Sequence, residues 1–278
     1  MPGSLPGVGN PTERLLEQLD LSPVADSASP RRWTAEIGEN GLNLKGRIFG
    51  GMIVGQSIVA AGRTFPDRHV HSVQQTFVRS GSPDVPLCYE VVELHTGGTY
   101  AAVRVELRQG DTLVAHSQIG LTTGAEGPDR QDPAPTVAPI EQMANRDELR
   151  QRPNWQNQPV QMFAEAEAMA DGQPDLAAWL RTANDMPDDQ LMHCAVLGFA
   201  SDRGMMPVAW KPHRDERPLN GASLDHSIWF HRPVRIDEWH SHVVHSASIA
   251  GGRGINHGLI HHHDGTHVAT TMQQGIYR

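Results

Sequence analysis

The chain has 278 residues, and 23 lysines and arginines against 32 aspartates and glutamates give it a formal net charge of −9. This length allows two domains, or one large one, with a core that needs no disulfide framework. The acidic balance argues against general nucleic-acid binding, which requires a basic surface, and no apolar stretch approaches the roughly 20 residues that span a bilayer.

The first residues and the cysteines indicate where in the cell the protein is located. The start of the chain lacks a basic region followed by an apolar one, so we expect no secretory signal. Cys88 and Cys194 are the only cysteines, and we expect both as ordinary buried thiols in a reducing compartment. We therefore expect a cytoplasmic protein.

The first half of the chain predicts one helix followed by strands. A lead segment, residues 1–30, is rich in Pro, Ser and Gly and holds a short helical candidate at 13–19. Small and apolar residues at helical spacing predict a largely buried helix over 52–65. Runs rich in Val and Thr, separated by glycine-containing turns, predict strands at 71–78, 87–94, 99–107 and 112–122.

A proline-rich stretch separates this half from the next. We interpret residues 124–160 as a linker with a short helix at 140–150, followed by helical candidates at 160–170 and 175–182. The first pattern then returns. An apolar helix is predicted at 190–201, with strands at 222–230, 240–249, 255–262 and 267–276.

Corresponding residues of the two halves are separated by a nearly constant number of positions, which indicates an internal duplication. Gly97-Gly98 corresponds to Gly251-Gly252 at +154, and His71-Ser72 corresponds to His226-Ser227 at +155. Each half is therefore one helix followed by antiparallel strands, an α+β unit. The sheet is expected to wrap the helix, since both must bury an apolar face.

Asp202 is the sharpest candidate for chemistry. It falls on the same helical stripe as Leu191, Ala195 and Gly198, and a carboxylate on a core-facing stripe must find donors or become neutral. The alternative is that Asp202 lies just past the end of the helix and caps it. The residues alone leave both interpretations open.

Residues 223–233 form the densest polar and aromatic stretch. On a strand, Ser223 and Asp225 share one face and His226 lies on the other, as at the rim of a site. A structural network that ties the strand to a turn is the alternative, which we favour for Asp225. A serine nucleophile is not supported, because no Gly-x-Ser-x-Gly elbow occurs, and both cysteines lie in predicted regular elements.

Sixteen histidines raise the question of a metal, and ten of them follow residue 225. Consecutive histidines on a strand point to opposite faces, so His261, His262 and His263 are not expected to converge on one ion. His240 and His242 share a face, but no cysteine or carboxylate stands at zinc-like spacing beside them. We expect no metal and no cofactor, since phosphate-binding and dinucleotide-binding motifs are also absent.

Two stretches resemble the type II acyl-CoA thioesterases: residues 47–56 (RIFGGMIVGQ) and 223–233 (SLDHSIWFHRP). Residues 186–189 and 197–202 also fit, and the resemblance runs from about Trp33 to Tyr277. It implies a double hotdog, in which each of two repeats has an antiparallel sheet wrapped around a central helix. The repeats would span 31–124 and 186–278, with residues 125–185 as the linker carrying short helices.

The resemblance also implies an activity, hydrolysis of fatty acyl-CoA to free fatty acid and CoA, within fatty acid metabolism. The family uses an Asp, a Thr or Ser, and a Gln to bind and activate a water, and the matching residues are Asp202, Ser223 and Gln273. Ser223 replaces the threonine of the family's best-known pattern. A carboxylate can remove a proton from the water while the other two groups orient it. The backbone N–H groups of Gly50 and Gly51 are candidates for binding the oxyanion.

Further expectations concern the substrate and the assembly. Arg79, Arg232 and Arg253 lie at predicted strand ends or turns and are, as a set, the candidates for binding the CoA phosphates, although for each one alone a solvated or ion-paired arginine is the favoured explanation. The family resemblance implies a homodimer or a higher homo-oligomer.

Two other functions are compatible with a hotdog fold. A non-catalytic hotdog acyl-CoA-binding protein is the alternative, which three competent side chains disfavour. A hydratase would carry a Gly-Asp-x-Asn-Pro-like loop, which is absent. We predict one active site per chain, because aligning Gly55 with Gly198 places Val59 opposite Asp202.

Overall fold

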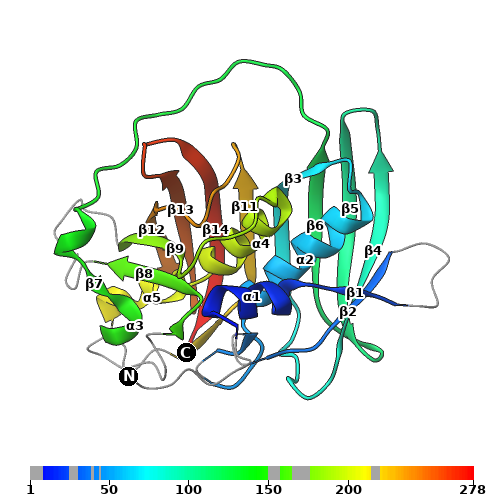
Figure 1. The fold of residues 1–278 in the computed structure, drawn as a ribbon. Coiled ribbons are helices and arrows are strands. Elements are labelled where there is room, and N and C mark those ends of the chain that lie inside the picture. The colour runs from blue at the N-terminus through cyan, green and yellow to red at the C-terminus, as the bar shows by residue number, and fades with distance from the viewer. Residues whose placement is uncertain are drawn as a thin grey trace, which may run out of the picture.

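The computed structural model of the chain describes residues 9–24, 31–38, 41–43, 45–149, 157–164, 176–213 and 220–278. Their strands form one 14-stranded sheet, every pair of which is antiparallel, and the sheet curves around two helices (Figure 1). A long connection, residues 123–139, arches from the first half of the sheet to the second (Figure 1).

The first half of the sheet is wrapped around helix α2 (Gly50–Thr64). Its strands lie in the order β2-β4-β5-β6-β3. Their bounds are β2 (Arg32–Ala35), β3 (His69–Phe77), β4 (Leu87–Thr96), β5 (Tyr100–Gln109) and β6 (Thr112–Thr122). The buried helix and four strands predicted from the sequence are therefore confirmed, with β2 as an additional strand.

The second half repeats this arrangement around helix α4 (Gln190–Ser201). Its strands lie in the order β11-β14-β13-β12-β9, and β3 pairs with β11 to join the halves. Their bounds are β9 (Leu176–Thr182), β11 (Asp225–Phe230), β12 (His240–Ala250), β13 (Arg253–His262) and β14 (His267–Tyr277). The α+β double hotdog is confirmed. The short strand β10 (Gly221–Ser223) also pairs with β14.

The helical candidates between the halves are wrong where the structure describes them. Strand β8 (Val160–Ala164) and strand β9 stand there instead, and β9 pairs with β12 as β2 pairs with β4. Residues with good helix propensity, such as those of LAAWLRT, form a strand here because pairing and burial against the sheet override local preference. Residues 165–175 lie outside the described residues.

The expected helix at 140–150 is replaced by shorter elements. These are the 3₁₀ turn η2 (Ile140–Gln142), the strand β7 (Ala144–Asn145) and the four-residue helix α3 (Arg146–Leu149). Strand β7 pairs with β8 at the edge of the sheet, and β1 (Ser22–Pro23) lies at the opposite edge. The four domain boundaries themselves stay a prediction.

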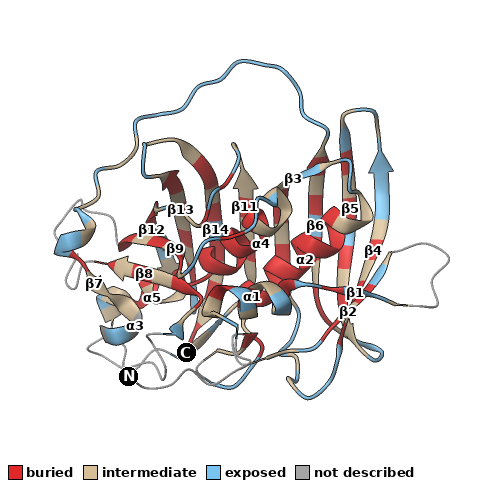
Figure 2. Ribbon diagram, in the orientation of Figure 1, coloured by how far each residue is buried: buried red, intermediate tan, exposed pale blue. Residues whose placement is uncertain are grey.

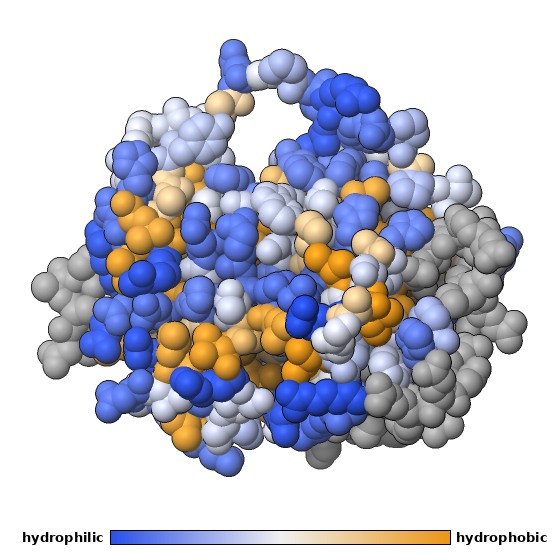
Figure 3. Space-filling view, turned by 180° about the vertical axis from the view of Figure 1, so that it is seen from behind, coloured by the Kyte–Doolittle hydropathy of each residue, from blue (hydrophilic) through white to orange (hydrophobic). Residues whose placement is uncertain are grey.

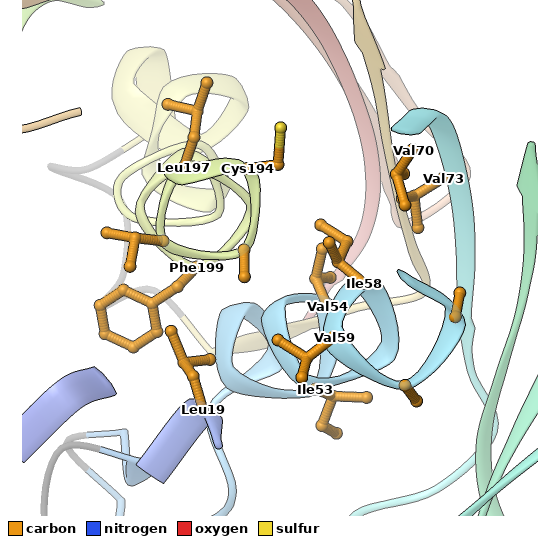
Figure 4. Close-up of a cluster of buried hydrophobic side chains, with 14 of the residues drawn as sticks. Leu19, Ile53, Val54, Ile58, Val59, Val70, Val73, Cys194, Leu197 and Phe199 are labelled. Carbon is orange, nitrogen blue, oxygen red and sulfur yellow. The ribbon is translucent and has the colours of Figure 1, made fainter. Parts of the chain in front are cut away.

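Both central helices are deeply buried, as Figure 2 shows. They pack closely because α2 presents glycines to α4: a Cβ added at Gly55 would lie 2.9 Å from the carbonyl oxygen of Ala195. Val54 and Ile58 of α2, labelled in Figure 4, pack against Gly198 of α4, where an added Cβ would lie 3.1 Å and 2.8 Å from their side chains. This crossing brings the beginning of α2 to the end of α4, and the candidate site lies there.

Three shorter helices complete the described chain. Helix α1 (Pro11–Leu19) confirms the candidate at 13–19, and Asn10 caps it. Helix α5 (Met206–Trp210) and the 3₁₀ turn η4 (Lys211–His213) follow α4. None of the helices in the described part of the chain is long and apolar enough to cross a membrane. The surface seen from behind mixes hydrophilic and hydrophobic groups, and the hydrophobic ones gather in its lower half (Figure 3).

Candidate active site

A cavity of about 490 Å³ opens between the two halves of the chain. This size is in the range of small-molecule sites. Its described lining comes from the segment before α2, the end of β3, the end of α4 and strand β10. Of the residues predicted from the sequence, Gly50, Arg79, Asp202 and Ser223 line it. Gly51 and Gln273 reach the site through Asp202.

Asp202 follows the last residue of α4 and is 7% exposed. Asp202 therefore lies just past the helix end and is also buried. The two alternatives from the sequence, a core-facing carboxylate and a residue at the helix end, are both correct for this position. The Gln273 side chain donates a hydrogen bond from Nε2 to Asp202 Oδ1, and the backbone N–H of Gly51 donates to the same carboxylate.

Glycine is required where α2 meets this carboxylate. A Cβ at Gly50 would lie 3.0 Å from Asp202 Oδ2, and a Cβ at Gly51 would lie 2.4 Å from the carbonyl oxygen of Phe199. Phe49, which immediately precedes α2, has no side chain that can accept a hydrogen bond from the first N–H groups of the helix. Asp202 therefore lies at an open helix N-terminus, where a negative charge is favoured.

The environment shifts the acidity of Asp202. Burial raises the pKa of this carboxyl above its ordinary value of 3.8, and His226, the Gln273 amide and the Gly51 N–H act against that rise. A carboxylate that is shielded from solvent is a stronger base than one in water, and the N–H groups of Gln273 and Gly51 keep it from being neutralised. This balance is what a general base for water requires.

His226 is a site residue for which the sequence left a site rim and a structural network as alternatives. It is fully buried beside Asp202, with Nδ1 3.9 Å from Oδ1. Ser201 Oγ donates to the carbonyl oxygen of Gly198, so it accepts from His226 Nε2 at 2.9 Å. The unprotonated Nδ1 then faces Gln273 Nε2 at 3.5 Å.

This order of hydrogen bonds fixes the amide of Gln273. One of its N–H groups points to Asp202 and the other to His226, so the amide nitrogen and oxygen cannot exchange places without loss. Burial lowers the pKa of His226, which keeps the ring neutral and able to accept. The oxygen of Gln273 has no hydrogen-bond partner among the described residues.

The proximity of Ser201, His226 and Asp202 is not a nucleophilic triad. Ser201 is fully buried and is not part of the cavity lining, so a substrate cannot reach its hydroxyl. The ring nitrogen facing Asp202 also faces an N–H donor from Gln273, which leaves it without a proton to give to the carboxylate. A cysteine nucleophile is disfavoured as well, because burial raises the pKa of Cys194 to about 12.

Ser223 and Asp225 take different roles. Ser223 lines the cavity and pairs with Gly275, two residues from Gln273 on β14. Asp225 accepts a hydrogen bond from the backbone N–H of Gln274 at 2.9 Å. Asp225 thus connects the beginning of β11 to β14, which agrees with the structural role favoured from the sequence.

Positive charge gathers at the cavity on an acidic chain. Its described lining includes five cationic side chains and one carboxylate, that of Asp202; the cations are Lys45, Arg47, Arg79, Arg146 and Arg203. The sequence interpretation named only Arg79 among these. Arg47 stands in a quoted motif, whereas no sequence signal marked Arg146, which comes from the segment between the halves.

The two other predicted arginines lie outside this lining. Arg232 follows β11 at the far end of the strand, donates to the carbonyl oxygen of His267 at 2.7 Å and pairs with Asp129. Arg253 is exposed at the beginning of β13.

Comparisons with known proteins agree on one family. A family model described as acyl-CoA thioesterase matches residues 151–276, and one described as the acyl-CoA thioesterase N-terminal domain matches 41–122. The chain is 31% identical to acyl-coenzyme A thioesterase 8 of Rattus norvegicus, over 84% of this chain and 80% of that protein. It is 28% identical to acyl-CoA thioesterase 2 of Haemophilus influenzae, over 84% and 88% of the two chains.

A solved structure extends the similarity to the fold. The crystal structure of an acyl-CoA thioesterase II from Mycobacterium marinum is 29% identical to this chain and matches it with a TM-score of 0.80. The match covers 95% of this chain and 98% of the other.

Proposed function

The chain belongs to the acyl-CoA thioesterase family and is a thioester hydrolase, and we propose that Asp202 activates the water that hydrolyses a fatty acyl-CoA to free fatty acid and CoA. One observation carries this proposal. Asp202 has one carboxylate oxygen held by Gln273, while the other lies beside Gly50 in the cavity wall.

The chemistry follows from these positions. Asp202 removes a proton from the water as its oxygen attacks the thioester carbonyl carbon. The tetrahedral intermediate then collapses, the carbon–sulfur bond breaks, and the CoA thiolate leaves and takes up a proton. The hydroxyl of Ser223, which lines the cavity, orients the water, and the Gln273 amide holds the carboxylate in line with it.

The developing oxyanion needs a donor that Asp202 does not already use. The Gly51 N–H is bonded to Asp202, so we assign the oxyanion to the Gly50 N–H at the first residue of α2. A position at the helix N-terminus adds the favourable end of the helix dipole.

The rest of the cavity suits the two ends of the substrate. The cationic side chains match the phosphates of CoA, which Lys and Arg bind through charge-assisted hydrogen bonds. Ile53, Phe77 and Met206 offer apolar surface to the acyl chain. We further propose a cytoplasmic location and a homodimer or higher oligomer, which the cysteine content and the family resemblance support.

Replacing Asp202 by Asn tests the proposal directly. The amide keeps the shape but accepts no proton, so kcat should fall by about 10²–10⁴-fold. Release of free thiol from palmitoyl-CoA and octanoyl-CoA measures this. Asp225→Asn is the matched control and should keep most of the activity.

The outcome also separates an enzyme from a binding protein. A wild-type chain that binds acyl-CoA without releasing thiol would be a non-catalytic binder. An Asp202→Asn variant with the wild-type rate would refute the assignment and make Asp225 the next candidate.

A further inference from the structure

Three potential metal ligands meet at the end of the sheet opposite the cavity. Glu238 lies in the connection between β11 and β12, His262 ends β13, and His263 begins the turn to β14. Their nearest ligand atoms all lie within 4.8 Å of one another.

The alternation of side chains along a strand predicts that consecutive histidines diverge, and this prediction is wrong for His262 and His263. Side chains alternate only while the chain is a strand, and β13 ends at His262. His263 belongs to the turn, where its backbone N–H donates to the carbonyl oxygen of Trp239 at 2.9 Å. The two imidazole rings therefore lie with their centroids 4.1 Å apart.

Both rings face the same carboxylate oxygen. Nε2 of His262 lies 2.7 Å from Glu238 Oε2, and Nε2 of His263 lies 3.4 Å from it. Ligands of a tetrahedral Zn²⁺ ion with bonds of about 2.0–2.2 Å are roughly 3.3 Å apart. Glu238 is exposed, so its side chain can make the small adjustment that an ion requires.

A second, independent feature orients His262. Its Nδ1 lies 3.0 Å from Asp264 Oδ1, which also accepts the backbone N–H of Thr266 at 2.8 Å. A metal-binding histidine almost always donates its other ring N–H to a carboxylate or carbonyl, which fixes the tautomer. Nδ1 keeps its bond to Asp264 when an ion replaces the proton between Nε2 of His262 and Glu238.

We propose that Glu238, His262 and His263 bind a divalent transition-metal ion, with Zn²⁺ the best match to two imidazoles and one carboxylate. The three ligands leave a fourth position for water. Strand β14 places Gln273 six residues beyond His267, about 20 Å at the rise of a strand. The ion therefore joins the β11–β12 connection to the β13–β14 turn and takes no part in hydrolysis.

Calorimetric titration of the full chain with ZnCl₂ tests the site, on protein without an affinity tag and after treatment with EDTA. We expect one ion bound at this site, a higher melting temperature with Zn²⁺, and thioesterase activity that EDTA does not change. His262→Ala and His263→Ala should each weaken binding, and Asp264→Asn should weaken it about 10–100-fold. His69→Ala, an exposed histidine on β3, is the matched control.

Two results would overturn the site. If the double variant His262→Ala/His263→Ala binds Zn²⁺ as the wild type does, the ion is held elsewhere, and the cross-strand pair His245 and His257 is then the next candidate. If the wild type takes up no Zn²⁺ and its melting temperature does not change, the group is only an ion pair between histidine and carboxylates. Absorption of Co²⁺ in the visible range distinguishes imidazole ligation from loose binding.

Discussion

Asp202 depends on its neighbours to remain a carboxylate in a buried position. Burial alone raises the pKa of this group and favours its neutral form, while the N–H groups of Gln273 and Gly51 favour the ionised form. His226 favours the ionised form indirectly. Its Nδ1 accepts a hydrogen bond from Gln273, and this bond holds the Gln273 amide with its nitrogen toward Asp202. His226 is therefore a positioning residue in this arrangement.

The pH dependence of the reaction reports on this balance. In the proposed mechanism hydrolysis needs the ionised carboxylate of Asp202, so kcat/KM should fall on the acid side at a pH above 3.8, the ordinary pKa of Asp. Gln273 lowers the pKa of Asp202, and Gln273→Ala should therefore raise that pKa and move the acid limb to higher pH. The loss in kcat should be smaller than for Asp202→Asn, because the base remains.

Gln274, the residue after Gln273, provides the control for the pH profile of Gln273→Ala. Gln274 is on the same strand but points to the other face, so Gln274→Ala should leave the pH profile in place. An acid limb that stays fixed in Gln273→Ala while kcat falls would mean that Gln273 acts on the water alone.

Helices α2 and α4 place the site through their close crossing. The glycines of α2 let the backbone of α4 approach, and the carboxylate after α4 then meets the first N–H groups of α2. Packing of two helices and formation of the site are thus one event. A side chain added at the crossing should damage both.

Gly51→Ala tests this coupling. The added Cβ would lie 2.4 Å from the carbonyl oxygen of Phe199, so the helices must separate. We expect a free energy of unfolding lower by about 1–3 kcal/mol, as for other overpacked cores, together with a loss of kcat. Gly98→Ala is the control, because nothing lies within 4 Å of its added Cβ. Denaturant unfolding and thiol release measure both effects, and unchanged stability would contradict the crossing as described.

At the scale of the whole molecule, the two halves meet where β3 pairs with β11, and the cavity lies at that junction. Both halves contribute to the lining of the cavity, but only the second half supplies the Asp202 carboxylate and the Gln273 side-chain amide. The corresponding position of the first half, Val59, is fully buried in the core.

One active site per chain should follow from this asymmetry. A valine activates no water, so in the proposed mechanism the first half supplies cavity walls, the Gly50 amide for the oxyanion and the Gly51 amide that binds Asp202. Titration with a tight, slowly hydrolysed acyl-CoA analogue should give one equivalent per chain. Two equivalents would show that the duplication preserved a second site.

The charge around the cavity predicts how the nucleotide end binds. Arg79→Glu should raise KM for acyl-CoA and spare a short acyl thioester that lacks the nucleotide. The effect should shrink as salt rises, because charges beyond about 8–10 Å are screened at physiological ionic strength. Arg232→Glu is the comparison, since Arg232 lies outside the lining. An equal rise in KM for both variants would mean that the phosphates bind elsewhere.

The repeated order of elements can be predicted from residue spacing alone, and the family resemblance adds three residues proposed for the reaction. Apolar spacing fixed α2 and α4, alternation fixed the strands that follow each helix, and the motifs pointed to Asp202, Ser223 and Gln273. These features are readable because each depends on residues close together in the chain.

Other features depend on long-range packing and are visible only in the folded chain. Strand β9 forms because β12 offers an edge to pair with, although its own residues favour a helix. His226 enters the site through a bond to Gln273, 47 residues away, and Arg146 enters the cavity from between the halves. His262 and His263 meet because a strand ends between them. Contacts of this kind leave no local pattern, because they depend on where the whole sheet brings distant residues.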